Sequence, residues 1–306
     1  DHETLYAKAR LYIRKGLEHE EPESEEVPLW CILALELLAR ATLAKVSPAL
    51  LADPTDGANV LYALGYTGKK APRSIPAKTV FHRCTVICEG FTEEDYKLCM
   101  SWLNSRNEEL HTGHLPFEGL RTSSWLSELY RVTQLLLEHN GSSLDDYIGK
   151  DRAQTALTML ESLSNVKAKE AHERVQAARE AFNALEIEDR LEKGGSAKKY
   201  VSERPRLLGR IKVETCPSCE SPAFVTGSLV RSTNPRDTEG ELVQDDVWLP
   251  VELNCVACGL VIDEHGHLAA LGLGDQYTTV DVLDPQEYYR IEFDPEDYFG
   301  EGYSND

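Results

Sequence analysis

Two pairs of cysteines near the C-terminus constrain the fold of this chain more than any other feature. Cys216 and Cys219 form one Cys-x2-Cys knuckle, and Cys255 and Cys258 form a second, with 35 residues between the two knuckles. Two such knuckles place four thiolates tetrahedrally around one Zn²⁺ and leave no position for water, which makes a structural site. Between them, apolar residues alternate in the manner of a half-buried strand (Val247, Leu249, Val251 and Leu253). We therefore expect a small β-rich unit that holds one Zn²⁺ per chain.

This arrangement resembles a zinc ribbon. A disulfide framework or a redox pair is the competing interpretation, and it fits poorly with two matched knuckles in a chain expected in the cytoplasm. His265 and His267 follow the last knuckle, but four cysteines already suffice, so we expect both to be turn residues. The remaining cysteines fall on apolar helix faces and are expected in the core (Cys31, Cys84, Cys88 and Cys99).

The chain before the knuckles has the apolar spacing of helices. Six segments show it up to residue 139 (3–17, 29–46, 57–66, 78–90, 93–111 and 123–139). They predict a helical bundle over residues 1–141. Segment 29–46 is apolar on several faces and should be its most buried helix, too short and too charged to span a membrane. The predicted fold class is therefore mainly α, with a small β-rich C-terminal part.

Two further segments separate the bundle from the knuckles. Residues 142–191 predict one long helix or a helical hairpin. Residues 193–212 hold seven basic residues against one acid, with Gly194-Gly195 between them, and read as a linker. Such a linker can contact a phosphate backbone, or it can be a solvated link that pairs with the acidic part after it. We thus expect a helical extension and basic linker over 142–203, and a zinc ribbon with an acidic, aromatic tail over 204–306.

Charge is distributed unevenly along the chain. The formal net charge is −20, yet the residues from Glu214 onward hold 20 Asp and Glu residues and only 3 Arg, a balance of −17. The N-terminal part is therefore nearly neutral and is compatible with nucleic acid. No segment resembles a signal peptide, so we expect a cytoplasmic protein without membrane association. The acidic, aromatic tail, residues 281–306, could contact a basic groove or pack on the ribbon.

The end of segment 93–111 carries a second motif. Arg106 is followed directly by Asn107, and His111 lies five residues after the Arg, with Gly113 expected to cap the helix end. Positions five apart on a helix differ by about 140° around its axis, so the Arg and His side chains flank a shared edge. Both can reach one cleft only if a partner surface closes over them. The competing interpretation is an ordinary polar helix terminus, where a His is favoured by the helix dipole.

This motif resembles the Arg-x4-His motif of the HEPN superfamily, small helical-bundle proteins that include metal-independent endoribonucleases of bacterial toxin and antiviral systems. The resemblance covers roughly residues 1–140. It implies a homodimer in which the two motifs line one cleft and RNA is the substrate. In one HEPN subgroup a Tyr stands two positions after the His and receives AMP from a partner enzyme. Gly113 occupies that position here, so control by that route is not expected.

The resemblance also implies roles for four residues. The ribose 2′-OH would attack the adjacent phosphorus and leave a 2′,3′-cyclic phosphate. His111 would act as general acid or base, because its pKa lies near neutrality. Arg106 would hold the phosphate, and Asn107 would position the phosphate or orient His111. Glu36, the acid inside segment 29–46, would face the Arg-His pair; its alternative role is an i,i+4 pair with Arg40.

Two other functions compete with a nuclease. One is a non-catalytic HEPN-like adaptor, in which the bundle dimerises and the motif is structural. The other is a zinc-ribbon protein that binds nucleic acid or protein, although the balance of −17 opposes DNA binding by that part. Under the nuclease hypothesis, the C-terminal part would bind a regulatory protein or a phage-derived trigger.

Overall fold

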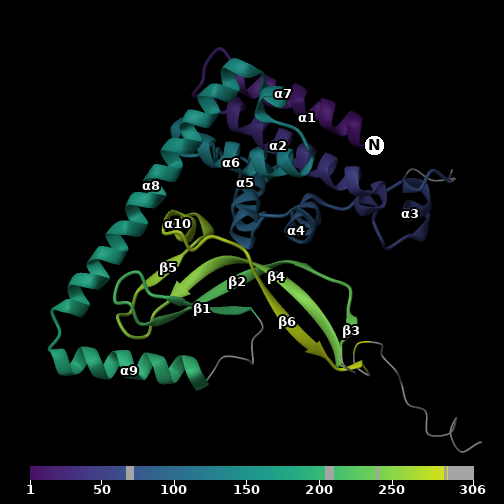
Figure 1. Ribbon diagram of the computed structural model, residues 1–306. Helices are drawn as coiled ribbons and strands as arrows, with labels where there is room; N and C mark the ends of the chain where they lie inside the picture. The colour runs from purple at the N-terminus through teal and green to yellow at the C-terminus, as the bar shows by residue number, and fades with distance from the viewer. Residues whose placement is uncertain (67–71, 204–209, 239–240, 286–287, 289–306) are drawn as a thin grey trace, which may run out of the picture.

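The computed structural model describes residues 1–66, 72–203, 210–238, 241–285 and 288 of this protein. Helices occupy the chain up to residue 203 and an antiparallel sheet follows, which confirms the predicted fold class. In Figure 1 the helical bundle lies at the top, and the long helix α8 (Lys150–Asn183) descends along one side. At its lower end α9 (Ile187–Glu203) turns beneath the sheet, so the sheet lies between α9 and the bundle.

Seven α-helices precede α8 among the described residues. They are joined by two short 3-10 segments, and their bounds are α1 His2–Leu17, α2 Glu26–Val46, η1 Pro48–Leu51, α3 Gly57–Ala63, α4 Ala77–Ile87, α5 Glu93–His111, η2 Thr122–Ser124, α6 Leu126–His139 and α7 Leu144–Ile148. As expected from its composition, α2 is the central helix. Its buried side chains Leu35, Leu38 and Leu43 belong to one apolar core shared with α1, α4, α5 and α6.

The crossing of α1 and α2 depends on a small residue. Gly16 of α1 is buried, and a Cβ built on it would lie 2.7 Å from the Sγ of Cys31 and 3.1 Å from the carbonyl oxygen of Val27. Glycine therefore lets the two helix backbones approach closely. All four cysteines of the bundle are buried, as predicted (Cys31, Cys84, Cys88 and Cys99).

Helix α2 is also long and apolar enough to cross a membrane by length and composition alone, since its 21 residues include a window of mean hydropathy 1.7. The sequence-based expectation that it is too short and too charged is therefore wrong. Two-thirds of that window, 67%, is buried inside the protein, as in the core helix of a bundle. The same apolar surface that would suit a lipid bilayer is covered here by neighbouring helices.

A buried carboxylate holds the start of α5 against α6. Asp95 is 1% exposed and accepts hydrogen bonds from the backbone N–H and the hydroxyl of Thr92, which form a capping box with it. Its other carboxylate oxygen lies 2.5 Å from Nη2 of Arg131 on α6. The pKa of Arg131 is raised because Asp95 and Glu128 outweigh the burial of its guanidinium. The helix that ends in the Arg-His motif is thus fixed at its opposite end.

We expect Asp95→Ala to destabilise the bundle by about 3 kcal/mol, because it removes a cap and leaves Arg131 without its buried partner. Chemical denaturation followed by helical circular dichroism measures this change. Glu94→Ala is the matched control, since Glu94 lies on the same helical turn but is exposed, and it should change stability by less than about 0.5 kcal/mol. A loss below about 1 kcal/mol for Asp95→Ala would contradict the assigned role.

Helices α8 and α9 form an elbow, in place of the single helix or the hairpin within 142–191 that the sequence predicts. The interpretation of residues 193–212 as a linker is wrong up to residue 203, because Lys193 to Glu203 belong to α9. Ala197 is fully buried against the sheet, and the rings of Tyr200 and Phe224 lie 5.6 Å apart. Tertiary packing therefore holds a Gly-containing, highly charged segment in a helix. Residues 204–209 lie outside the described residues.

The sheet has the strand order β1-β2-β4-β3, and β5 and β6 also pair with β4, at residues 252–254 and 242–248. Its strands are β1 Ile211–Thr215, β2 Pro222–Ser232, β3 Arg236–Thr238, β4 Glu241–Asn254, β5 Val261–Asp263 and β6 Tyr277–Leu283. Phe224 pairs with Asn254, so the start of β2 lies beside the end of β4. A second core lies under the sheet and includes Val175 of α8 and Ala197 of α9.

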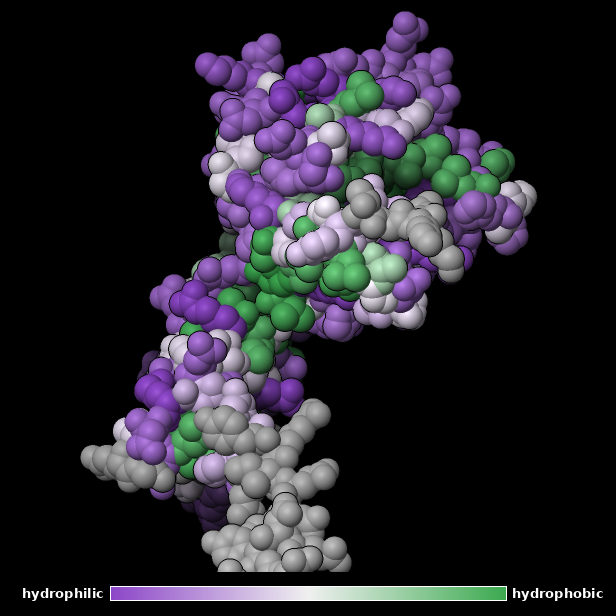
Figure 2. Space-filling model, turned by 90° about the vertical axis from the view of Figure 1, so that its right-hand side faces the viewer, coloured by the Kyte–Doolittle hydropathy of each residue, from purple (hydrophilic) through white to green (hydrophobic). Residues whose placement is uncertain are grey.

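Figure 2 shows one face on which hydrophobic residues form a band from the helical part to the sheet. Exposed apolar side chains of the helical part and the sheet include Leu61, Tyr62 and Leu64 near α3, Leu229 on β2, and Val280 and Val282 on β6. Most of the acidic, aromatic tail lies outside the described residues, which end for this segment at 285 and 288.

Candidate functional site

The Arg-His motif lies in the last two turns of α5. This helix spans Glu93–His111 as predicted, and Thr92 caps its start. Its end differs from the expectation, because Thr112 closes it by donating its N–H and its hydroxyl to the carbonyl of Glu108. Gly113 does not adopt a positive φ, so it is not a left-handed cap. The hydroxyl of Thr112 therefore caps the C-terminal end of α5, the role that was expected of Gly113.

Glu36 of α2 bridges two arginines. One carboxylate oxygen lies 2.8 Å from Nη2 of Arg40, and the other lies 2.9 Å from Nη2 of Arg106. All three side chains are about 85% buried, with exposures of 14% for Glu36, 15% for Arg40 and 14% for Arg106. Glu36 thus contacts Arg106 of the motif and also forms the i,i+4 pair with Arg40. The cluster keeps one net positive charge, and the buried Nε of Arg106 has no hydrogen-bond partner among the described residues.

Asn107 and His111 lie on another face of α5. Both side chains are exposed, and with Asn104, Glu108 and Thr112 they line a shallow cavity of about 480 Å³. Residues four apart on a helix share a face, which explains why Asn107 and His111 meet there. Arg106 does not line this cavity, because its guanidinium points to Glu36.

Within one chain, the structure therefore joins Arg106 to Glu36, and Asn107 to His111, without joining the two pairs into one site. Arg40 is a member of the buried cluster that the motif itself did not indicate. Its only sequence signal is its position four residues after Glu36 on an apolar helix.

The four knuckle cysteines come together at one end of the sheet. Their sulfur atoms all lie within 4.8 Å of one another. Sγ of Cys216 is 3.6 Å from that of Cys258, and Sγ of Cys219 is 3.5 Å from that of Cys255. These separations exclude disulfides, whose sulfurs lie about 2.0 Å apart. They agree with the edge of about 3.8 Å expected for four sulfurs placed tetrahedrally at about 2.3 Å from a metal.

The electrostatics of the cluster also fit a cation. Hydrogen bonds from Cys216 and then Cys255 lower the pKa of Cys258 to about 2, while hydrogen bonding to Cys255 raises the pKa of Cys216. Backbone amides support the sulfurs, as where the N–H of Ser218 lies 3.4 Å from Sγ of Cys216. Without a cation, neighbouring cysteine sulfurs share protons through such hydrogen bonds. A bound divalent cation would allow all four thiols to ionise. Burial instead raises the pKa of Cys31 to about 12, as expected for a core thiol.

Arg179 of α8 fixes the first knuckle to the helical part. Its guanidinium donates to the backbone carbonyls of Pro217 and Ser218, the residues between the first two cysteines. Sequence inspection missed this residue, since nothing in a charged helix distinguishes the one arginine that reaches a loop 38 residues later. The cysteine cluster is thus connected to α8 by hydrogen bonds as well as by apolar packing.

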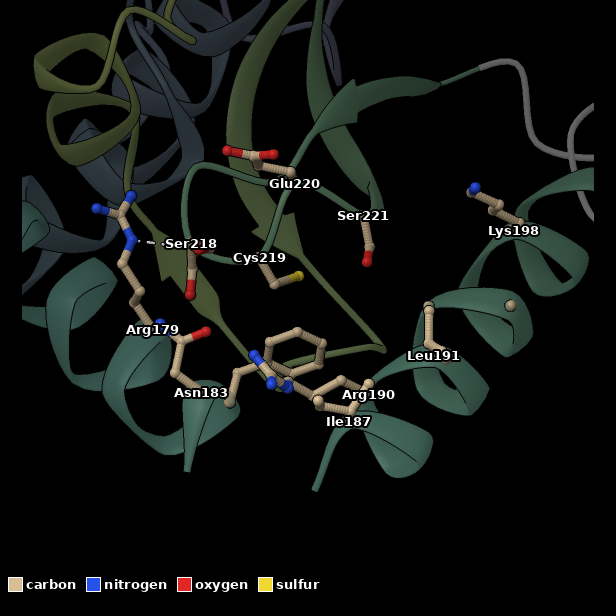
Figure 3. A pocket seen from close by; sticks show the side chains of 13 residues that line it. Arg179, Asn183, Ile187, Arg190, Leu191, Lys198, Ser218, Cys219, Glu220 and Ser221 are labelled. Carbon is tan, nitrogen blue, oxygen red and sulfur yellow. Dashed lines mark hydrogen bonds between the residues drawn. The ribbon is translucent and has the colours of Figure 1, made fainter. Parts of the chain in front are cut away.

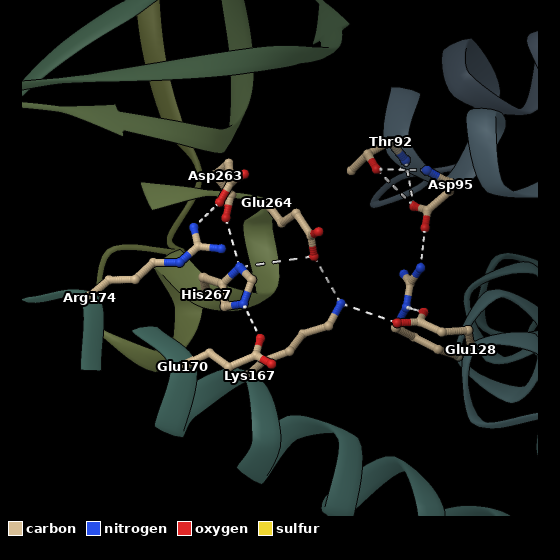
Figure 4. Close-up of polar contacts among 10 residues, drawn as sticks. Thr92, Asp95, Glu128, Lys167, Glu170, Arg174, Asp263, Glu264 and His267 are labelled. Carbon is tan, nitrogen blue, oxygen red and sulfur yellow. Dashed lines mark hydrogen bonds and ion pairs between the residues drawn. The ribbon is translucent and has the colours of Figure 1, made fainter. Parts of the chain in front are cut away.

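A chain of charges also connects the sheet to the bundle (Figure 4). Nζ of Lys167 on α8 lies 3.3 Å from Glu128 of α6 and 3.2 Å from Glu264, which precedes α10 (His265–Ala270). His267 is buried, and its ring nitrogens lie 2.8 Å from the carbonyl of Asp263 and 3.1 Å from Glu170. His265 and His267 thus belong to a short helix, whereas turn residues were expected, and neither is part of the cysteine cluster.

This chain of charges should make the contact sensitive to acid. Burial opposes ionisation of Glu128, but Arg131 and Lys167 outweigh it and lower its pKa below the ordinary 4.5. A carboxyl whose pKa falls on folding stabilises the protein above its unfolded pKa, and this stability is lost as the pH falls through the folded value. We therefore expect stability to decline below pH 4.5, measured by thermal denaturation from pH 7 to pH 3. Glu128→Gln should be less stable at pH 7 and should decline less; an unchanged profile would refute this.

A comparison of the chain with models of known protein families, with curated proteins and with solved structures finds no match.

Proposed function

We propose that this protein is a metal-independent endoribonuclease that acts as a homodimer. The observation that carries the proposal is the Glu36–Arg106 ion pair beside the exposed pair of Asn107 and His111. The motif resembles that of HEPN nucleases, in which an acid of an early core helix faces the Arg-His pair. A cytoplasmic location and a role in bacterial toxin or antiviral systems follow from that resemblance and stay predictions.

The arrangement supports the proposed chemistry in two ways. Glu36 holds the guanidinium of Arg106 in one orientation, and the positive charge left on the three-residue cluster favours a phosphate. His111 is exposed at a helix end, where its imidazole can exchange protons with a substrate. The 2′-OH would lose its proton and bond to phosphorus while the bond to the 5′ oxygen breaks. That oxygen takes up a proton, which leaves a 2′,3′-cyclic phosphate and a 5′-OH.

Dimerisation would complete the site. A single chain offers one imidazole on the cavity and keeps Arg106 on a neighbouring face, so a second copy has to supply the opposing groups. Leu110 within the motif and Leu115 just after it are exposed by 48% and 55% and supply apolar surface for such contact.

The experiment is an incubation of the full-length protein with total RNA. Parallel reactions contain EDTA, or metal-free buffer without chelator as the control for loss of zinc. Cleavage in both, with cyclic phosphates on the 3′ ends, is the expected result. RNA that stays intact under every condition would overturn the proposal.

The second candidate is a non-catalytic adaptor, and the pairing of Arg106 with Glu36 favours it. An arginine that is 14% exposed and bonded to a carboxylate can be purely structural. The adaptor hypothesis predicts intact RNA and a Glu36→Gln variant that loses stability only. The nuclease hypothesis predicts that this variant also loses cleavage rate.

We also infer that the four-cysteine cluster holds one Zn²⁺ per chain. Four thiolates at tetrahedral spacing match the preferred ligands and geometry of structural zinc. Zn²⁺ would join the two knuckles and contribute to folding without entering the RNA reaction. Elemental analysis of purified protein should find one zinc per chain. The C-terminal part would then be a rigid unit able to bind a regulatory protein or trigger.

A further inference from the structure

A large cavity lies at the elbow of α8 and α9, next to the first cysteine knuckle. Its volume is about 920 Å³, and none of the residues of the Arg-His motif lines it. Figure 3 shows side chains of α9, among them Ile187 and Arg190, across the cavity from Cys219 and Ser221 of the knuckle. The first cysteine knuckle and the elbow thus form its opposite walls.

The charged side chains that line this cavity are mostly basic. Arg179, Arg190 and Lys198 contribute positive charge, against the single acid Glu220. In Figure 3 the carboxylate of Glu220 points away from Arg190 and Lys198. Arg179 already donates to the knuckle, whereas the buried Nε of Arg190 has no hydrogen-bond partner among the described residues. Within the described part of the chain neither Arg190 nor Lys198 forms an ion pair, so both are available to an anion.

Two glycines of α9 leave part of its backbone without side chains where the helix lines the cavity. Gly194 and Gly195 lie in the interior of this helix, where glycine is unfavourable relative to alanine. Packing does not require them, because a Cβ at Gly195 would meet nothing within 4 Å and one at Gly194 would make an ordinary contact of 3.6 Å with Ser221. Because glycine has no Cβ, a ligand in the cavity can approach the backbone of α9 closely.

Apolar surface lies beside the positive charge. Ile187 and Leu191 line the cavity and are 65% and 71% exposed. Phe182 of α8 joins them and supplies an aromatic ring. A ligand that matches this lining has an anionic group for the guanidinium and ammonium, and a flat apolar ring for the remaining wall.

We propose that this cavity binds a nucleotide, either free or at the 5′ end of an RNA strand. Arg190 and Lys198 bind its phosphate, Gly195 lets the phosphate approach α9, and the base lies against Phe182, Ile187 and Leu191. Because the cavity contacts both the elbow and the metal knuckle, an occupied site would hold these two elements together. The proposal is independent of RNA cleavage, since no residue of the motif takes part.

The test uses full-length protein with His111→Ala, so that RNA is not consumed whichever function the motif has. Calorimetry measures binding of AMP, ATP and inorganic phosphate, and fluorescence anisotropy measures an eight-nucleotide RNA with a 5′ phosphate and a 3′ label. We expect saturable binding of AMP or of this RNA, weaker at high salt. Competition between AMP and the RNA would show that they share one site. Binding of only one of them would show whether the cavity takes a free nucleotide or the 5′ end of an RNA strand.

Variants make the result specific. Arg190→Gln and Lys198→Gln should each weaken binding at least about tenfold, the range expected for one charge-assisted contact. Gly195→Ala should weaken binding several-fold while raising the melting temperature, because alanine favours the helix but fills the opening. Lys199→Gln is the matched control, since Lys199 is the next residue on α9, pairs with Glu203 and does not line the cavity.

Three results would overturn the proposal. The first is the absence of saturable binding of AMP, ATP and the RNA. The second is an equal loss of binding in Lys199→Gln and Arg190→Gln, which would indicate diffuse attraction. The third is equal competition by an acidic peptide, which would identify a basic protein-docking surface. None of these results depends on whether the protein cleaves RNA.

Discussion

His111→Ala should lower the rate of RNA cleavage by about a thousandfold, the contribution typical of a general acid or base. His111 is exposed at the end of α5 and lines the motif cavity, so the substitution removes a reacting group without opening the core. Single-turnover cleavage of a defined RNA measures the change. Arg106→Ala should cause a similar loss through the phosphate, together with lower stability, because Glu36 then keeps only Arg40 as its partner.

The controls separate a catalytic role from a structural one. His114→Ala changes an exposed histidine three residues further on, outside the cavity, and should leave the rate within about twofold. Glu36→Gln should reduce the rate less than Arg106→Ala, because the amide can still accept a hydrogen bond from the guanidinium. Equal cleavage rates for wild type and His111→Ala would rule out His111 as the general acid or base.

Removal of the metal should unfold the C-terminal sheet and leave the bundle folded. Structural zinc contributes on the order of 10 kcal/mol in small zinc domains, more than a core as small as the one under this sheet can replace. Cys216→Ser, or a strong chelator, should therefore expose the amides of β2 and β4 to rapid hydrogen exchange. The helices of the bundle should stay protected, since their core contains no residue of the sheet.

A matched variant tests whether the sheet unfolds because the metal is lost or because any buried thiol is removed. Cys88→Ala removes a buried thiol of the bundle, outside the cluster, and should keep one zinc per chain and a protected sheet. Unchanged exchange of β2 and β4 in metal-free protein would show that packing on α8 and α9 alone supports the sheet.

Several features were predictable because their signals are local. Apolar spacing predicted a helix over 93–111, which is where α5 lies. The four cysteines were predictable as one cluster because each knuckle is a turn of four residues. The elbow and α9 were not, since Gly194-Gly195 and the basic residues favour a loop, and burial of Ala197 against the sheet overrides that preference.

The sequence by itself determined the class of most elements, α9 excepted, and the residue types at the two motifs, because cysteine spacing and apolar periodicity act within a few residues. Only the tertiary structure decided which residues meet. Glu36 joins Arg106 from 70 positions away, Arg179 reaches the first knuckle, and Lys167 connects the bundle to the sheet. Each of these contacts depends on how helices cross and how strands pair. Those choices follow from the packing of whole apolar faces, and no local stretch of sequence specifies them.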